Sequence, residues 1–138
     1  MPVFGGRSLR NLSGAHPDIQ KVMFAAIADF DFTVLQSSRT EEEQEADFAK
    51  GVSKAHWLQS AHDYEPSFAV DCCPYPLDWK DIKTFTEMAH VILSHAKRLH
   101  IEMTWGGDWT SIKDYPHFEL THWRTLRNHT QPDAALIS

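Results

Sequence analysis

The chain has 138 residues and a mass of 15.8 kDa, which fits one compact domain with a hydrophobic core. Its formal net charge is −6 and it has no cluster of lysines or arginines, which argues against nucleic acid as a partner. No apolar run is long enough to cross a bilayer, so we expect no stable membrane insertion.

The first third of the chain predicts two helices and a strand between them. Apolar residues at helical spacing predict a helix over about 17–30, and a β-branched apolar run predicts a strand over 32–35. Thr40 and Glu43 have the spacing of a capping box, which starts a second helix. Gly51 is expected to end that helix.

The rest of the chain adds one long helix and three short strands. Residues 55–66 have no clear periodicity. The next elements are predicted as a buried strand over 68–72, a helix over about 79–99, and strands over 101–105 and 117–120, with a Gly106-Gly107 turn between the last two. The sequence therefore predicts an α+β domain with about three helices and a small, mainly antiparallel sheet.

We expect a single domain over residues 1–138, with its core at about 17–125 and flexible ends at 1–12 and 130–138. The first ten residues contain no apolar segment of the kind found in secretory signals. If the substrate lies outside the cytoplasm, we expect another factor to give the protein access to it.

Two adjacent cysteines, Cys72 and Cys73, stand in the predicted buried strand. Neighbouring cysteines rarely form a bridge, so we expect no disulfide framework. They can serve as soft metal ligands, but burial in a strand is the interpretation that we favour.

His62, Asp71 and His117 are residue types that hold zinc and leave a coordination position open for water. Asp114, three residues before His117, is placed to act as a base on that water. By spacing alone this is a weak signal. A surface-loop histidine, an aspartate bonded to backbone N–H groups and an Asx turn are the alternatives for His62, Asp71 and Asp114.

The residues around these positions carry a more specific signal. Ser60-x-His62, Ala69-x-Asp71 and Asp114-x-x-His117 resemble the signature of the peptidase family that contains D-Ala-D-Ala carboxypeptidases, the D,D-dipeptidases of vancomycin resistance and phage L-alanyl-D-glutamate endopeptidases. The resemblance is closest to the phage members and runs from about residue 17 to residue 120. Further similar motifs occur in the same order: Phe32-Thr33-Val34, Arg39-Thr40 with Gln44, Gly51-Val52-Ser53-Lys54, Pro74-Tyr75-Pro76 with Asp78-Trp79, and Trp105-Gly106-Gly107-Asp108-Trp109.

The resemblance implies a hedgehog/DD-peptidase-like fold with His62, Asp71 and His117 as zinc ligands and Asp114 as the catalytic carboxylate. It also places Arg39 near the active site, where a guanidinium would stabilise an oxyanion or hold a substrate carboxylate. The loop between His62 and Asp71 departs from many relatives, which have a shorter, glycine-containing segment there. We expect this difference to alter the shape of the pocket more than the metal site.

Several of these residues have alternative interpretations. Arg39 can instead pair with Glu42 or Glu43 on a helix surface. Glu119 is either a second carboxylate near the metal or a cross-strand partner of a cation. Trp105, Trp109 and Trp123 are candidates for a substrate cleft, but aromatic core packing is the default, above all for Trp105.

The expected function is that of a zinc-dependent peptidoglycan peptidase, an endolysin that hydrolyses the L-alanyl-D-glutamate bond of the murein stem peptide. The alternatives are a D-Ala-D-Ala carboxypeptidase and a non-catalytic cell-wall-binding or phage structural module on the same fold. We expect a monomer that accumulates in the cytoplasm of the bacterial host and acts on the cell wall after a separate pore-former opens the membrane.

Overall fold

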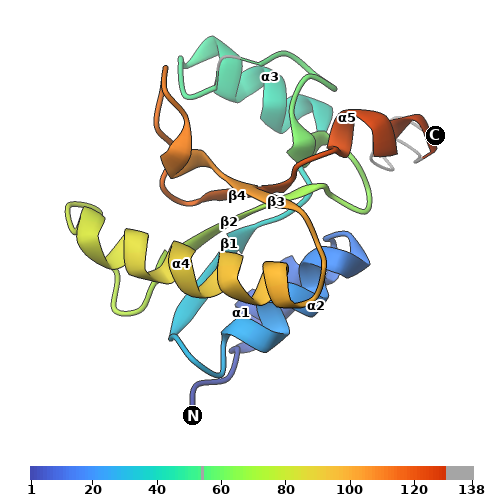
Figure 1. Cartoon of the computed structure of the whole chain (residues 1–138). Helices are drawn as coiled ribbons and strands as arrows, with labels where there is room; N and C mark the ends of the chain where they lie inside the picture. Colours follow the sequence, from blue (N-terminus) through green and yellow to red (C-terminus); the bar gives the residue numbers. More distant parts are fainter. Residues whose placement is uncertain (54, 130–138) are drawn as a thin grey trace.

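The computed structural model describes residues 1–53 and 55–129, which form an α+β domain (Figure 1). The described helices are α1 (Gly6–Ser13), α2 (Pro17–Ala26), α3 (Glu41–Ala49), α4 (Ile82–Arg98) and α5 (Trp123–Leu126). The strands are β1 (Phe32–Gln36), β2 (Ala69–Pro74), β3 (Met103–Trp105) and β4 (His117–Leu120). Three short 3-10 helices are η1 (Ala61–Asp63), η2 (Gly106–Asp108) and η3 (Arg127–His129). The tail expected at 130–138 lies outside the described residues.

The four strands form one sheet in the order β1-β2-β4-β3, and each neighbouring pair is antiparallel. Helices α1, α2 and α4 lie on one side of this sheet, whereas α3, η1 and α5 lie on the other (Figure 1). This arrangement confirms the predicted α+β class and antiparallel sheet, with five α-helices in the described part instead of about three. No helix there is both long and apolar enough to cross a membrane.

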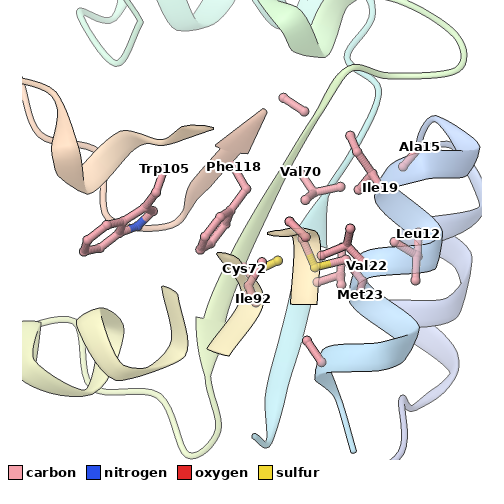
Figure 2. Packing of buried hydrophobic residues seen from close by; sticks show 14 of the residues in the cluster. Leu12, Ala15, Ile19, Val22, Met23, Val70, Cys72, Ile92, Trp105 and Phe118 are labelled. Atoms are coloured by element: carbon pink, nitrogen blue, oxygen red, sulfur yellow. The ribbon is translucent and has the colours of Figure 1, made fainter. Parts of the chain in front are cut away.

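The hydrophobic core lies between the sheet and the helices α1, α2 and α4. Alternate residues of a strand point to opposite faces, and Val70 and Cys72 of β2 point toward the helices together with Phe118 of β4 (Figure 2). They meet Ile92 of α4 and Met23 of α2, and all five side chains are fully buried. Both cysteines are free and buried, as the favoured interpretation predicted.

Helix α1 corrects the expectation of a flexible segment over residues 1–12. Its Ser8 and Leu12 are buried, and Phe4 just before it makes edge-to-face contacts with Phe24 and Phe32. The helix lies along the edge strand β1, where the Ser8 hydroxyl accepts from the Val34 N–H at 3.1 Å. Polar contacts to a strand edge leave no apolar periodicity in the sequence, which is why the pattern did not predict this helix.

The other helix boundaries differ from the predictions by a few residues. The capping box of Thr40 and Glu43 is present and starts α3 as expected. Helix α2 ends at Ala26 instead of near residue 30, and α4 begins at Ile82 instead of near residue 79. The side chain of Asp81 accepts a hydrogen bond from the Thr84 N–H at 3.1 Å, and this cap sets the start of α4.

Candidate metal centre and substrate pocket

The pairing of β2 with β4 brings two predicted metal ligands together. Asp71 and His117 are directly opposite one another in the ladder, so both side chains leave the same face of the sheet. Val70 and Phe118 are paired one position along and point to the core instead. The antiparallel register therefore places an aspartate and a histidine side by side on the face that α1, α2 and α4 do not cover.

His62 reaches the same place from η1. The Ser60 hydroxyl accepts from the His62 N–H at 3.3 Å, and the Phe68 N–H donates to the Ala61 carbonyl at 2.9 Å, which ties η1 to the chain entering β2. The Arg39 N–H donates to the His62 carbonyl at 2.7 Å. These backbone contacts fix the position of a buried imidazole that the sequence placed only in an irregular segment.

The three side chains present donor atoms at the separations of a tetrahedral metal site. The His62 Nε2 lies 3.3 Å from the Asp71 Oδ1 and 3.3 Å from the His117 Nδ1, and the Asp71 Oδ1 lies 3.5 Å from the His117 Nδ1. A tetrahedral zinc site with bonds of about 2.0–2.1 Å separates its donors by about 3.3–3.4 Å. The arrangement thus suits a small divalent cation, and it is the metal-capable group found among the described residues.

The outer nitrogen of each histidine has an acceptor of its own. The His62 Nδ1 lies 2.7 Å from the Ser37 carbonyl, and the His117 Nε2 lies 2.7 Å from the Glu119 Oε1. A carbonyl or carboxylate oxygen only accepts, so these outer nitrogens carry protons, and the inner nitrogens are the ones that can offer a lone pair to a metal. Hydrogen bonds of this kind commonly orient metal-bound histidines.

The charge balance of the centre also favours a cation. The Asp71 Oδ1 is buried without a hydrogen-bond partner in the described structure, although an unpaired buried carboxylate is costly. Burial alone would raise the pKa of Asp71, but the His62 and His117 imidazoles outweigh it and hold that pKa far below its usual value. Burial opposes protonation of His117, whereas Asp71 and Glu119 raise its pKa to about 9. The carboxylates of Asp71 and Glu119 are therefore stabilised by a positive charge at the centre, which a proton or a metal ion supplies.

Asp114 belongs to the same pocket, as the sequence predicted. A cleft of about 770 Å³ is lined by Arg39, Asp114 and the three metal-capable residues. Burial and the negative charge of Asp71 raise the pKa of Asp114, although His117, His62 and Arg39 oppose that rise. The Asp114 N–H donates to the Gly106 carbonyl at 3.0 Å, and a Cβ at position 106 would overlap the Asp114 carbonyl oxygen. Glycine is therefore needed at position 106 to hold Asp114 in place.

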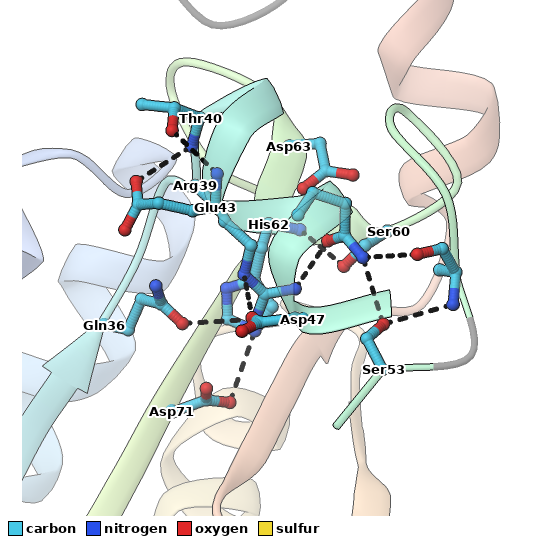
Figure 3. Close-up of polar contacts among 12 residues, drawn as sticks. Gln36, Arg39, Thr40, Glu43, Asp47, Ser53, Ser60, His62, Asp63 and Asp71 are labelled. Atoms are coloured by element: carbon cyan, nitrogen blue, oxygen red, sulfur yellow. Dashed lines mark hydrogen bonds and ion pairs between the residues drawn. The ribbon is translucent and has the colours of Figure 1, made fainter. Parts of the chain in front are cut away.

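Arg39 lies at the wall of this pocket with its guanidinium already engaged (Figure 3). Its Nη1 donates to the Gln44 Oε1 at 2.6 Å, its Nη2 donates to the Gln36 Oε1 at 3.1 Å, and its Nε lies 3.6 Å from the Asp47 Oδ2. It does not pair with Glu42 or Glu43; Glu43 serves the capping box instead. The structure therefore supports the expected location of Arg39 beside the centre, held by partners that the sequence did not indicate.

The aromatic residues divide between core and pocket. Trp105 is buried and donates its indole N–H to the Tyr115 carbonyl at 2.7 Å, which agrees with core packing. Trp109 lines the cleft, with its ring centroid 5.0 Å from that of His117. Trp123 is buried at the cleft wall and donates to the Glu119 Oε2 at 3.0 Å.

Glu119 is the residue whose role the sequence left open. It is not among the three residues that converge on the centre; its oxygens meet the outer nitrogen of His117, with which it forms an ion pair when that imidazole is protonated, and the indole N–H of Trp123. The strand pattern contains a signal for this, because residues two apart on β4 share a face. The partners Ser37, Gln36 and Asp47 had no such signal, since their contacts depend on how loops and helix α3 fold over the sheet.

Comparisons with known proteins identify the family of the chain. Residues 2–123 match the family model described as phage L-alanyl-D-glutamate peptidase. The chain is 31% identical over 124 residues to the L-alanyl-D-glutamate peptidase of Escherichia phage T5, across 85% of this chain and 88% of that protein. It superposes on the crystal structure of the Serratia marcescens L-Ala D-Glu endopeptidase ChiX with a TM-score of 0.77 and 30% identity, across 91% of this chain and 92% of that one. The chain therefore belongs to the phage L-alanyl-D-glutamate peptidase family.

Proposed function

We propose that this protein is a zinc-dependent endopeptidase that hydrolyses the bond between L-alanine and D-glutamate in the stem peptide of peptidoglycan. The observation that carries the proposal is the tetrahedral spacing of the donor atoms of His62, Asp71 and His117, with Asp114 lining the same cleft. We take the L-alanyl-D-glutamate bond as the bond that is cut because the chain belongs to the phage L-alanyl-D-glutamate peptidase family.

Zinc is the metal that the donor set favours, because two imidazoles and one carboxylate at this spacing suit its tetrahedral geometry. When bound, zinc supplies Lewis acidity, which makes water a competent nucleophile near neutral pH and polarises a carbonyl. His62, Asp71 and His117 would hold it, while Ser37 and Glu119 orient the two imidazoles. Three protein ligands leave a coordination position open, as catalytic sites require.

Asp114 serves as the general base in this proposal. Its carboxylate accepts a proton from the attacking water and then returns that proton to the amine of the departing D-glutamate residue. A pKa raised by burial suits both steps, because the group must release the proton that it has taken up. Arg39, fixed by Gln36 and Gln44, places a positive charge at the cleft wall, where it would stabilise the negative charge that develops on the carbonyl oxygen.

The test is mass spectrometry of murein digested by zinc-loaded protein, with the Asp114→Ala variant as the matched control. Cleavage by an endopeptidase frees the stem peptide with an N-terminal D-glutamate. Loss of a terminal D-alanine would instead identify the carboxypeptidase alternative. The variant should bind zinc and fold as the wild type does but release no peptide, and chelation should abolish the reaction until zinc is restored. Absence of either product would refute the peptidase assignment and favour a non-catalytic module.

We also propose that the enzyme acts as a monomeric endolysin, which accumulates in the cytoplasm of its bacterial host and reaches murein after a separate pore-former opens the membrane. Cells that express it alone should continue to grow, and they should lyse when their membrane is permeabilised. Lysis without permeabilisation would refute this order of events.

A further inference from the structure

Three cationic side chains line the cleft beside the metal-capable centre: Arg39, Lys113 and Arg124. The same cleft is lined by four carboxylates, one more than its cations: Asp47, Asp71, Asp114 and Glu119. A negatively charged part of a substrate that lies beside these carboxylates is stabilised where a cation of the protein is available to meet it. Which of the three cations is available follows from the contacts that each one makes.

Two of them are engaged within the protein. The guanidinium of Arg39 is buried among Gln36, Gln44 and Asp47. The Lys113 Nζ donates to the carbonyls of Gly107 and Trp109, each at 3.2 Å, and so it braces the loop before Asp114. Neither side chain can turn to a ligand without giving up these contacts.

Arg124 differs from both. It is exposed at α5, and its guanidinium carbon lies 4.5 Å from the ring centroid of Trp123. For residues 1–53 and 55–129, the structure records neither a hydrogen bond nor an ion pair of this guanidinium. Stacking on an aromatic face leaves the edge of the guanidinium, with its fork of N–H donors, free to meet a carboxylate in two parallel hydrogen bonds.

A short chain of contacts fixes Arg124 relative to the centre. The Trp123 ring beneath it donates its N–H to the Glu119 Oε2 at 3.0 Å, and the Glu119 Oε1 lies 2.7 Å from the His117 Nε2. The position of the guanidinium is thus tied to the imidazole that faces the metal centre. A group bound by Arg124 would therefore lie at a set place relative to the metal-capable centre.

The proposed substrate contains a matching anion. Glutamic acid has two carboxyl groups, and a glutamate residue within a peptide uses one of them to continue the chain. The other remains ionised at neutral pH, since a glutamate carboxyl has a pKa of about 4.3. We propose that Arg124 binds this free carboxylate of the D-glutamate residue and thereby determines specificity for the residue on the leaving side of the bond. This inference rests on the proposed endopeptidase function.

The experiment compares two synthetic stem peptides that contain the L-alanyl-D-glutamyl bond. One keeps the free carboxylate of the D-glutamate residue, and the other carries a carboxamide there. We expect zinc-loaded wild-type protein to favour the carboxylate peptide by about 10- to 100-fold in kcat/KM, mainly through KM, as expected for a charged hydrogen bond. Arg124→Ala should reduce this preference to about twofold or less, by losing activity on the carboxylate peptide alone. Arg124→Lys should keep part of the preference, because it retains the charge without the fork.

Arg127→Ala is the matched control, because Arg127 lies over the same Trp123 ring at 5.4 Å but does not line the cleft. It should leave the preference unchanged. Equal cleavage of the two peptides by the wild type would overturn the inference and leave the peptidase function standing. An Arg124→Ala variant that slows both peptides alike would also overturn it, since Arg124 would then only support Trp123. Failure of the wild type to cleave either peptide or murein would overturn both the inference and the proposed function.

Discussion

The Glu119 carboxylate accepts a hydrogen bond from the His117 imidazole across 2.7 Å, from a position two residues further along the same strand. Because these residues share one face of β4, the contact needs no help from distant parts of the chain. With the Nε2 proton held by Glu119, Nδ1 is the nitrogen that faces Asp71 and His62. The carboxylate therefore sets which nitrogen is offered to a metal.

Replacement of Glu119 by glutamine should weaken zinc binding by about 10- to 100-fold, as observed when hydrogen bonds to metal-bound histidines are lost. The glutamine amide has a single oxygen, whereas the carboxylate uses one oxygen for His117 and the other for Trp123. One of these two hydrogen bonds is therefore lost in the variant. Competition with a chromophoric chelator measures the affinity. Glu102→Gln, which changes an exposed carboxylate paired with His122, is the control and should bind zinc as the wild type does. Equal affinities of both variants would show that Glu119 does not orient His117.

Gly106→Ala should lower kcat more than it lowers zinc affinity. The added methyl group would overlap the Asp114 carbonyl, so the base must move, and a displacement of about 1 Å in a catalytic group costs about 100-fold in rate. The nearest atoms that the methyl group meets all belong to Asp114 and not to a metal-capable residue, so zinc stoichiometry should stay near that of the wild type. Gly5→Ala is a suitable control, since a Cβ at position 5 meets nothing within 4 Å. Loss of zinc together with activity would place the damage at the metal centre instead.

Zinc binding should release about one proton per site at neutral pH, because metal and proton compete for the His117 Nδ1. In the metal-free protein the pKa of His117 is raised from 6.5 to about 9. A histidine with a raised pKa stabilises the fold below its unfolded pKa, and this contribution is lost as the pH rises through about 9. Thermal melts of chelated protein should therefore show Tm falling between about pH 7 and pH 9.5. Calorimetry in buffers of different ionisation enthalpy counts the released proton, and a count of zero at pH 7.5 would contradict the assignment.

Asp63→Asn should raise the stability of the protein, relative to the wild type, more at pH 8 than at pH 5. Burial raises the pKa of Asp63 from 3.8 to about 7, although Arg39 and the Leu58 N–H oppose the rise. Between these two values the folded state holds a proton that the unfolded state has lost, so this carboxyl makes stability fall as the pH rises from about 4 to 7. The quantity to measure is the Tm of the variant minus that of the wild type, at both pH values with saturating zinc. A difference that does not increase toward pH 8 would show that Asp63 ionises without cost.

The sequence predicted the elements that have strong periodicity and the residues that the structure brings into a metal-capable cluster. Strand β4 has the predicted bounds, because its apolar residues alternate with His117 and Glu119. The three metal-capable residues and Asp114 were predicted from short motifs, and the structure brings them to one cleft. Local motifs suffice here because the antiparallel register then determines which residues are neighbours.

The missed features depend on contacts between segments that are distant in sequence. Helix α1 is held by polar contacts with an edge strand, such as the two hydrogen bonds from the Asn11 side chain to the carbonyls of Val34 and Leu35, at 2.8 and 3.0 Å. The partners of Arg39 come from β1 and α3, and Ser37 meets His62 across 25 positions of chain. No periodic pattern records such pairings, since each depends on the completed arrangement of helices around the sheet.

Because Asp71 pairs directly with His117, the metal-capable centre forms only when β2 and β4 pair in the correct register. A slip of β4 by one residue would turn His117 into the core and present Phe118 to solvent, so a misregistered sheet would lack the centre altogether. An ion that binds these residues would stabilise the native pairing selectively over every shifted alternative. Metal supply would then favour folding yield as well as catalysis, because the strand pairing that the ion stabilises is also the pairing that brings two of its binding residues together.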